Sequence, residues 1–361
     1  MIPLTVPLIE DDDLEAVASV LRTGYLVQGV NVAAFEAAVA EAVGVDHAIA
    51  VSNGTAALHL ALLALGIEPG HFVAVPTYSW PATANVVEAV GARCVFVDIE
   101  PGSWAMSSDA LSEVAEPLAA VIPVHPFGLM ADLQNLAAAA PGVVVIEDAA
   151  CALGASRDGH AAGSVGAVGC FSFHPRKAVT TGEGGMVTTS SAKLDLALRQ
   201  WRNHGIHATA GTSDFVLPGL NYRLTDMQGA LGVTQMDKID RVVDARRAAA
   251  GVYAELLDGT PISPPLAIEG SEPVFQSYVT VLPEGIDRAR LITAAADNGV
   301  QVQIGTVGMP FTSYYRDKYS IQRGQFPVTE AWIGRHLSLP LYPGITREQQ
   351  ETVVSTVVGL L

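Results

Sequence analysis

Lysine is scarce in this chain of 361 residues, which contains only Lys177, Lys193, Lys238 and Lys318. None of them lies in the first 176 residues, so lysine does not serve as general surface charge. Lys177 lies in FSFHPRKAVTTGEGG, between an aromatic-polar segment and a glycine-rich turn. Its isolation indicates a specific role.

Cysteine is also rare, with only Cys94, Cys151 and Cys170. These are too few for a disulfide framework, and their spacing matches no zinc or iron–sulfur pattern. We therefore expect no disulfide scaffold and no metal centre.

Long uncharged apolar runs are absent, although 50% of the residues are hydrophobic. No such run reaches the roughly 18 residues that a membrane-spanning helix needs. The N-terminal segment MIPLTVPLIEDDD lacks the basic start and the long apolar stretch of a signal peptide. We therefore expect a cytoplasmic protein without transmembrane helices.

Positive charge is in short supply, because 20 Lys and Arg residues face 37 Asp and Glu residues and the formal charge is −17. A field of this sign repels DNA, RNA and acidic membrane surfaces, so we expect neither nucleic acid nor membrane as a partner. An anionic ligand must then be held by local hydrogen-bond donors.

Short apolar runs alternate with helical patterns such as Thr55–Leu65 and Ala131–Ala140. Strand–helix alternation with runs that are apolar on both faces predicts an α/β fold with a mostly parallel central sheet flanked by helices. The predicted strands are Ala48–Ser52, Phe72–Pro76, Arg93–Asp98, Ala119–Val124 and Val143–Asp148.

The chain changes character after residue 240, where one continuous helix is predicted from Thr225 to Leu257. We predict a large domain over residues 1–245, including an N-terminal arm, and a smaller C-terminal α/β domain over residues 246–361. The elements predicted there are a strand at Gln276–Leu282, a helix at Arg288–Asn298, a polar-aromatic loop from Tyr314 to Phe326 and a last helix from Arg347.

The segment SNGTAAL, Ser52–Leu58, combines a strand end, a glycine turn and a helix start. A helix N-terminus offers free N–H groups and a positive dipole, so Gly54 and Thr55 suit a phosphate group. The alternative is that Thr55 only caps the helix.

The segment VVVIEDAA ends an apolar strand with Glu147 and Asp148. An acid at the carboxyl end of a parallel strand lies where ligands bind in open α/β sheets. An aspartate there can pair with a protonated ring nitrogen, as pyridoxal phosphate requires. The alternative is a cap for the helix that follows.

Lys177 follows a strand candidate that contains Ser172. An amine in a partly dry site becomes a nucleophile toward aldehydes, and Ser172 suits a second phosphate contact. A Walker A loop is excluded because no GxxxxGK[ST] motif occurs. The alternative is an exposed turn lysine.

The segment TYSWPATAN contains Trp80 just beyond a predicted strand. An indole in this position can stack on a flat ring. The alternative is an aromatic residue buried in the core.

The order of the motifs SNGTAALHLAL, EDAA, CFSFHPRK, TTGEGG, RNHG, LNYRLTDMQGA and LSLPLYPG resembles the DegT/StrS-type nucleotide-sugar aminotransferases. The resemblance extends from about Pro7 to the final helix. It implies a pyridoxal-phosphate enzyme of fold type I, with a mostly parallel sheet and a smaller C-terminal α/β domain.

The resemblance implies a role for each residue of the predicted site. Lys177 matches the catalytic lysine that forms the Schiff base with pyridoxal phosphate. Asp148 matches the partner of the pyridine nitrogen, and Trp80 matches the aromatic residue that stacks on the ring. His174 and Glu183 lie in the same motifs, and simple packing or turn capping stays open for both.

Gly54, Thr55 and Ser172 match ligands of the cofactor phosphate. Asn221, in GLNYRL, matches an asparagine that reaches the phosphate of the neighbouring subunit. The resemblance therefore implies a homodimer with shared active sites.

The implied reaction moves an amino group from an amino acid, usually glutamate in this family, to a keto sugar linked to a nucleotide. Lys177 moves the proton during this exchange. The implied setting is the biosynthesis of amino sugars, cell-surface polysaccharides or antibiotics.

Two departures from the family pattern leave alternatives open. In DAACALGA, Cys151 occupies a position that is commonly Gln or His, and Leu153 one that is often His. A thiol is a weak donor toward the cofactor's ring hydroxyl. The stretch Gln301–Tyr315 contains no histidine where many relatives have one that meets the sugar. A keto cyclitol or another small ketone therefore stays open as the acceptor.

Three other functions are less consistent with these residues. A dehydratase of the same family carries histidine in place of Lys177 or needs cysteines for an iron–sulfur cluster. A non-catalytic regulator keeps the fold without needing Lys177 and Asp148. A cysteine desulfurase needs a mobile reactive cysteine, whereas Cys151 and Cys170 flank apolar strands.

Overall fold

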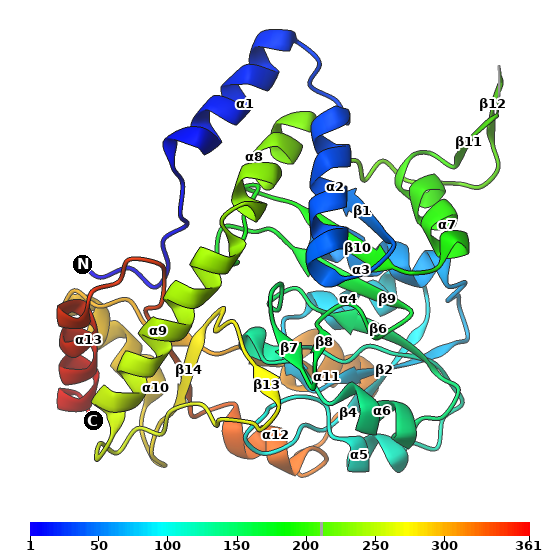
Figure 1. The fold of residues 1–361 in the computed structure, drawn as a ribbon. Coiled ribbons are helices and arrows are strands. Elements are labelled where there is room, and N and C mark those ends of the chain that lie inside the picture. The colour runs from blue at the N-terminus through cyan, green and yellow to red at the C-terminus, as the bar shows by residue number, and fades with distance from the viewer. Residues whose placement is uncertain (210–211) are drawn as a thin grey trace.

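A seven-stranded sheet forms the centre of the computed structural model, which describes residues 1–209 and 212–361 (Figure 1). The strand order is β1-β10-β9-β6-β5-β2-β4. β10 is antiparallel to both of its neighbours, and the remaining neighbouring strands are parallel. The predicted mostly parallel sheet is confirmed. The strands are β1 (His47–Val51), β2 (Phe72–Pro76), β4 (Arg93–Val97), β5 (Leu118–Val121), β6 (Val144–Asp148), β9 (Val168–Ser172) and β10 (Gly185–Thr189).

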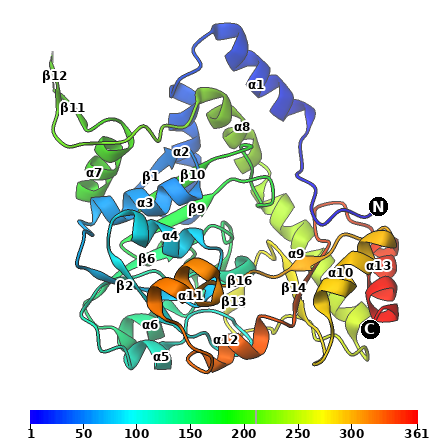
Figure 2. The same cartoon turned by 180° about the vertical axis from the view of Figure 1, so that it is seen from behind.

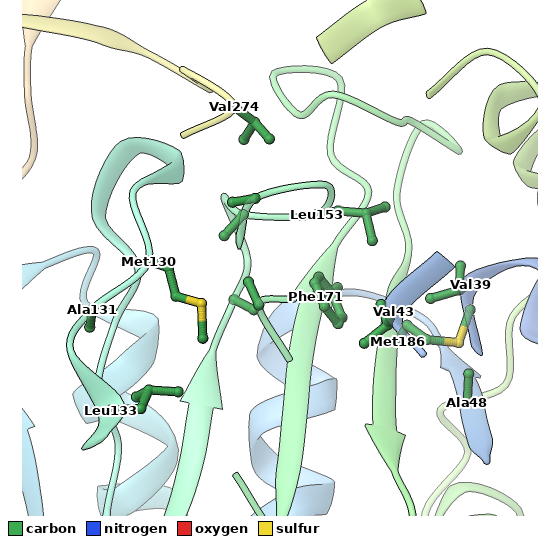
Figure 3. Packing of buried hydrophobic residues seen from close by; sticks show 14 of the residues in the cluster. Val39, Val43, Ala48, Met130, Ala131, Leu133, Leu153, Phe171, Met186 and Val274 are labelled. Carbon is green, nitrogen blue, oxygen red and sulfur yellow. The ribbon is translucent and has the colours of Figure 1, made fainter. Parts of the chain in front are cut away.

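Helices cover both faces of this sheet because alternate strand residues point to opposite sides. In β1, Ala48 and Ala50 belong to one apolar core, whereas Ile49 and Val51 belong to the other. Figure 3 shows part of the first core, and Figure 2 shows helices of the second. Helices of the first core are α2 (Val30–Val43), α5 (Ser108–Ser112) and α6 (Leu133–Ala139); helices of the second are α3 (Gly54–Ala64), α4 (Ala82–Ala89) and α7 (Ala192–Arg202).

The C-terminal part has its own antiparallel sheet, in the order β14-β17-β15. Buried residues of this sheet and of helices α9, α10 and α13 form a separate core. Along α9, Val243 still belongs to the first core, whereas Ala249 belongs to this one. The division at residue 245 stays a prediction. The elements are α9 (Ile239–Leu257), β14 (Tyr278–Val281), α10 (Arg288–Asp297), β15 (Gln303–Ile304), β17 (His336–Leu339) and α13 (Arg347–Gly359).

The prediction of one helix from Thr225 to Leu257 is wrong, because the helix is interrupted after Met236. Helix α8 spans Asp226–Met236, and α9 begins only at Ile239. The N–H of Lys238 bonds to the carbonyl of Gln235, three residues earlier, so the last turn of α8 tightens at this point. The side chain of Lys238 is held by acids of another helix, which a helical pattern cannot reveal.

The segment from Tyr314 to Phe326 was predicted as a loop, but its first part is the helix α11 (Ser313–Tyr319). The rings of Tyr315 and Tyr319 pack edge-on against Phe96 of β4, with centroid distances of 5.4 and 5.6 Å. This packing stabilises a helix that the local sequence alone does not predict.

Smaller elements complete the described part of the chain. The β11–β12 strand pair extends away from the body of the molecule (Figure 1). Among the described residues, no helix is both long and apolar enough to cross a membrane. The remaining elements are β3 (Tyr78–Ser79), β7 (Ser156–Arg157), β8 (His160–Ala161), β11 (Ile206–Thr209), β12 (Thr212–Phe215), β13 (Ser271–Glu272), β16 (Val307–Gly308), α12 (Pro327–Trp332) and 3-10 helices at Pro126–Gly128 and Met309–Phe311.

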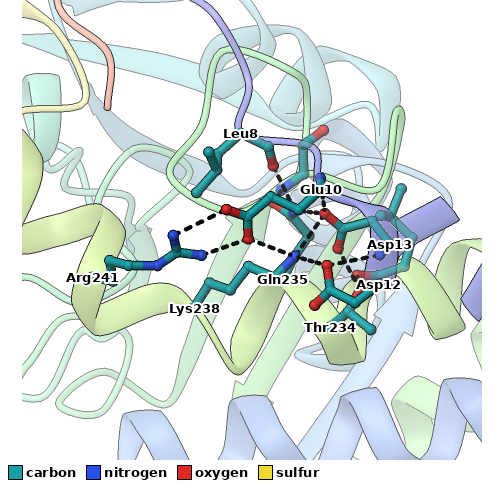
Figure 4. Close-up of polar contacts among 10 residues, drawn as sticks. Leu8, Glu10, Asp12, Asp13, Thr234, Gln235, Lys238 and Arg241 are labelled. Atoms are coloured by element: carbon teal, nitrogen blue, oxygen red, sulfur yellow. Dashed lines mark hydrogen bonds and ion pairs between the residues drawn. The ribbon is translucent and has the colours of Figure 1, made fainter. Parts of the chain in front are cut away.

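Helix α1 (Asp11–Thr23) is tied to α8 and α9 by a polar cluster around Asp13 and Lys238 (Figure 4). The Lys238 Nζ atom lies 2.8 Å from Asp13 Oδ2 and 2.6 Å from Asp12 Oδ1. The side chains of Lys238 and Asp13 are 7% and 1% exposed. Thr234 and Gln235 also donate hydrogen bonds to Asp13.

Burial raises the pKa of Asp13, but the hydrogen bonds from Lys238, Thr234, Gln235 and the N–H of Glu10 outweigh it, so the pKa lies below its ordinary value. The ionised carboxylate is therefore the form that these donors stabilise. Its stabilising contribution is full above the ordinary pKa of 3.8 and is lost as pH falls through the lower value of the folded state.

Replacing Lys238 with methionine removes the cation but keeps most of the apolar stem. We expect Lys238→Met to lower the free energy of unfolding by about 3 kcal/mol, because it leaves the buried Asp13 carboxylate without its partner. Urea denaturation of the purified chain measures this loss.

The matched control is Arg241→Met, because Arg241 pairs with Glu10 in a solvent-exposed ion pair. Exposed pairs add little stability, so this variant should unfold close to the wild type. Equal losses in the two variants would contradict a special role for the buried pair.

Candidate active site

A cavity of about 1050 Å³ lies where strands of the central sheet end. Gly54 follows β1, Trp80 follows the short strand β3 just beyond β2, and Asp148 and Ser172 end β6 and β9. Ser338, from β17 of the C-terminal sheet, also lines the cavity. Ligands of open α/β sheets bind at the carboxyl ends of strands, so this cavity is the candidate active site.

The chain brings most of the predicted site residues to this one cavity. Asn221 is the exception, because it is exposed and does not belong to the described residues that line the cavity, although its neighbour Tyr222 does. His174 and Glu183 are also in the lining. The lining includes the predicted residues Gly54, Thr55, Trp80, Asp148, Cys151, Ser172 and Lys177.

The N-terminus of α3 opens on this cavity. Asn53 is the N-cap residue, and its side chain accepts a hydrogen bond of 2.8 Å from the N–H of Ala56. The N–H of Ala57 makes the bond to the Asn53 carbonyl that starts the helical ladder. The N–H groups of Gly54 and Thr55 precede that bond and have no acceptor within the helix. The cap is therefore Asn53, not Thr55 as the alternative interpretation held.

Two glycines let this helix end approach the neighbouring strands closely. A Cβ atom at Gly54 would lie 2.8 Å from Ser172 Cβ, and one at Gly185 would lie 2.4 Å from the carbonyl oxygen of Asn53. Neither distance leaves room for a methyl group. The amides of the α3 N-terminus and the hydroxyl of Ser172 therefore lie at the same corner of the cavity.

Asp148 is buried, with 5% of its surface exposed. Its Oδ2 atom accepts a hydrogen bond of 2.7 Å from Thr83 Oγ1, and Oδ1 accepts one of 3.3 Å from the N–H of Ala150. Burial raises the pKa of Asp148, and the hydrogen bond from Thr83 offsets only part of this rise. A cation bound next to this carboxylate would stabilise its ionised form.

Glu147, the residue before Asp148, supports the end of β6 from within the protein. Its Oε2 atom lies 2.9 Å from His125 Nε2, and both side chains are fully buried. Since Nδ1 of His125 accepts from the N–H of Ala131, the proton is assigned to Nε2, which donates to Glu147.

Burial raises the pKa of Glu147, but hydrogen bonds from His125 and from the N–H groups of Gly163 and Gly166 outweigh it. The pKa of Glu147 therefore lies below its ordinary value. This carboxylate is satisfied internally and is not available to a ligand.

Lys177 lies in the loop between β9 and β10. Bonds from Phe173 N–H to the Gly184 carbonyl and from Lys177 N–H to the His174 carbonyl, each 2.8 Å long, hold this loop. Lys177 Nζ reaches Cys151 Sγ at 3.0 Å, and its side chain is half-buried. The alternative of an exposed turn lysine is therefore wrong.

Trp80 lines the cavity and is 69% exposed. The alternative of a buried core aromatic is therefore wrong. An exposed indole at a cavity has a free face that can cover a planar ligand.

Sequence reasoning did not find several residues that shape this site. Thr83 lies only a few residues after Trp80, but no local pattern shows that its hydroxyl meets Asp148. His59 Nδ1 lies 3.1 Å from the hydroxyl of Tyr222, and both line the cavity. These contacts join distant segments, so they depend on the fold.

The aminotransferase family model for DegT/DnrJ/EryC1/StrS matches residues 7–358. The chain is 37% identical over 355 residues to a UDP-N-acetyl-3-dehydro-alpha-D-glucosamine 3-aminotransferase of Acidithiobacillus ferrooxidans, covering 97% of this chain and 94% of that relative. It is 32% identical over 378 residues to a UDP-4-amino-4-deoxy-L-arabinose–oxoglutarate aminotransferase of Shewanella sediminis, covering 99% and 97%.

The fold matches the sugar aminotransferase Spr1654 of Streptococcus pneumoniae in its PMP form, with a TM-score of 0.94 and 25% identity over 100% of this chain and 99% of that one. The PLP form of the same protein also matches, with a TM-score of 0.94. The predicted fold type, aminotransferase activity and dependence on pyridoxal phosphate are confirmed. The chain belongs to the DegT/DnrJ/EryC1/StrS aminotransferase family.

Proposed function

We propose that this aminotransferase moves an amino group from an amino acid, in first place glutamate, to a keto sugar linked to a nucleotide. The observation that carries the proposal is the single cavity that collects Lys177, Asp148 and the N-terminus of α3. The two relatives named above act, by their names, on UDP-linked sugars. A cavity of about 1050 Å³ has room for a cofactor together with a sugar.

The residues of the cavity fit pyridoxal phosphate. The corner formed by Gly54, Thr55 and Ser172 supplies N–H and hydroxyl donors for the phosphate, and a Cβ at Gly54 would collide with Ser172 at this corner. Asp148 is a buried carboxylate without an ion-pair partner among the described residues, which suits a protonated ring nitrogen. These assignments are our proposal.

The remaining residues of the predicted site surround the same space. The face of Trp80 is free to cover the ring. Cys151 lies beside Lys177, and we propose that its thiol lies near the ring hydroxyl as a weak donor. Lys177 would hold the cofactor covalently through Nζ, and the amino donor would free this amine by taking its place on the cofactor.

Bound pyridoxal phosphate supplies an electron sink for the carbon that loses its proton. Asp148, whose carboxylate is held in position by Thr83, would keep the ring nitrogen of the cofactor protonated. Lys177 Nζ removes the proton from the substrate carbon and returns one to the adjacent centre, as general base and then acid. The half-buried position of Lys177 restricts the access of bulk water to this amine.

We further propose a homodimer in which Asn221 of one protomer completes the site of the other. Asn221 is exposed and lies outside the cavity of its own chain, while its neighbour Tyr222 lines it. An exposed side chain next to the cavity, but outside it, is free to reach the cavity of a second copy of the chain. A cytoplasmic location and the lack of nucleic-acid or membrane partners stay predictions from the composition.

The substrate assignment is tested by a screen of nucleotide-linked keto sugars and keto cyclitols as acceptors, with glutamate and glutamine as donors. The holoenzyme is loaded with amino groups by the donor, and its absorbance then reports the return to the aldehyde form on addition of each acceptor. Turnover of a nucleotide-linked keto sugar supports the proposal. Turnover of keto cyclitols alone would contradict it.

Replacing Lys177 with alanine removes the amine that binds the cofactor and moves the proton. We expect turnover to fall about a thousandfold or more. Borohydride reduction followed by mass spectrometry should find no covalent cofactor on the protein. Lys193→Ala, an exposed lysine of α7, is the matched control and should keep wild-type activity. Normal turnover by Lys177→Ala would refute the catalytic role.

Replacing Asn221 with alanine should weaken cofactor binding in the dimer. Mixed dimers with Lys177→Ala decide which site Asn221 serves. If Asn221 acts on the partner's site, each mixed dimer has one intact site and one with both defects. Activity and cofactor affinity then recover to about half of the wild-type sites. No recovery on mixing would show that Asn221 serves its own chain.

Replacing Gly185 with alanine should push the start of β10 away from Asn53 and displace the N–H and hydroxyl donors proposed to bind the phosphate. Overpacking costs roughly 1–3 kcal/mol, so we expect the dissociation constant of pyridoxal phosphate to rise about tenfold or more. Gly251→Ala, in α9 with no atom within 4 Å of the added methyl, is the control and should bind the cofactor normally. Unchanged affinity in Gly185→Ala would refute the tight corner.

A further inference from the structure

The cavity contains few cationic side chains for an enzyme whose substrates are anions. Arg176 and Lys177 are the only arginine and lysine among the described residues that line it. Lys177 is engaged in the chemistry, so Arg176 is the cation that remains for substrate binding. The formal charge of −17 gives no general attraction for an anion, so this local charge matters more.

The guanidinium of Arg176 is free to meet a ligand. Arg176 is exposed, and within residues 1–209 and 212–361 its side chain makes no ion pair and no hydrogen bond to another residue. Several other exposed arginines of this chain pair with acids, as Arg241 does with Glu10. An unpaired guanidinium at a cavity is suited to bidentate binding of phosphate.

The backbone of Arg176 is fixed from both sides. Its N–H donates to His174 Nδ1 at 3.2 Å, and its carbonyl accepts from Gln276 Nε2 at 3.1 Å. Gln276 belongs to the C-terminal part of the chain and also lines the cavity. The backbone from which the Arg176 side chain extends is therefore fixed before binding, so less conformational entropy is lost when the side chain binds a ligand.

Two kinds of anion can occupy this position: a carboxylate of the amino donor and the diphosphate of the nucleotide sugar. Glutamate has one carboxylate on the reacting carbon, which must come to Lys177 Nζ in the half-buried part of the cavity, and a second one only two methylene groups away. The diphosphate is separated from the keto carbon by atoms of the sugar ring, so it extends toward solvent. The exposure of Arg176 matches the diphosphate.

We propose that Arg176 binds the diphosphate of the nucleotide-linked sugar and so determines the preference for nucleotide-linked acceptors. This inference rests on the proposed function. The residue acts in substrate binding and takes no part in proton transfer.

Steady-state kinetics of the dimeric holoenzyme test the inference, with a UDP-linked keto sugar as acceptor, glutamate as donor and UDP as competitive inhibitor. We expect Arg176→Gln to raise both the KM for the nucleotide sugar and the inhibition constant of UDP about tenfold to a hundredfold, the range for a charged hydrogen bond. The kcat and the KM for glutamate should stay within about twofold. The KM of the variant should also depend less on salt.

Two further variants sharpen the test. Arg176→Lys keeps the charge without the planar fork and should recover part of the affinity for UDP. Arg290→Gln removes an exposed arginine of α10 outside the cavity and should leave all constants unchanged.

The outcomes separate this inference from the proposed function. If the wild type turns over the nucleotide sugar and Arg176→Gln has unchanged constants, the inference is wrong and the proposed function stands. A rise in the KM for glutamate alone would assign Arg176 to the donor carboxylate and overturn the inference. If the wild type does not turn over nucleotide-linked sugars at all, the proposed function fails, and the inference fails with it.

Discussion

The close approach of three strand ends is the constraint on which the rest of the site depends. Gly185 is paired with Val51 of β1 on one side and with Ser172 of β9 on the other. No side chain fits between Gly185 and Asn53 or between Gly54 and Ser172, so the start of α3 lies directly against β10 and the end of β9. The loop that carries Lys177 begins at this same point. The sheet register thus determines where the N–H groups of α3, the Ser172 hydroxyl and the Lys177 amine lie relative to each other.

Glu147 and Asp148, the two acids at the end of β6, have different surroundings: Glu147 supports the strand end, and Asp148 faces the cavity. They are adjacent in an extended strand, so their side chains point to opposite faces of the sheet. Glu147 is fully satisfied by His125 and backbone N–H groups, and it holds the strand end in place. Asp148 receives weaker support and remains short of positive charge. A rigid acid whose hydrogen bonds are satisfied within the protein thus positions its neighbour Asp148, which we propose is paired by the ligand.

Much of this arrangement could be predicted from the sequence because it depends on local patterns. Strands that are apolar on both faces identify the central sheet, and residues at their carboxyl ends identify most of the cavity, including Asp148 and Lys177. The break between α8 and α9 could not be predicted, because it coincides with contacts between Lys238 and acids of α1, which is distant in the sequence. The hydroxyl of Thr83 on Asp148 joins segments 65 residues apart, so no local pattern reveals it. The proposed contact of Asn221 is with a second copy of the chain, so neither the sequence nor the single chain tests it.

An acidic chain that handles anionic molecules must rely on fixed local donors. Its net charge repels phosphate at long range, but this repulsion is screened within about 10 Å at moderate salt. Inside the cavity, N–H groups at the start of α3 would act on a bound anion at contact distance and in a drier environment, where each donor contributes more binding energy. Their positions are set by the backbone, so they lose little entropy on binding. An acidic surface is therefore compatible with the proposed binding of anions in the cavity, because the surface charge acts at long range and the donors act at contact distance.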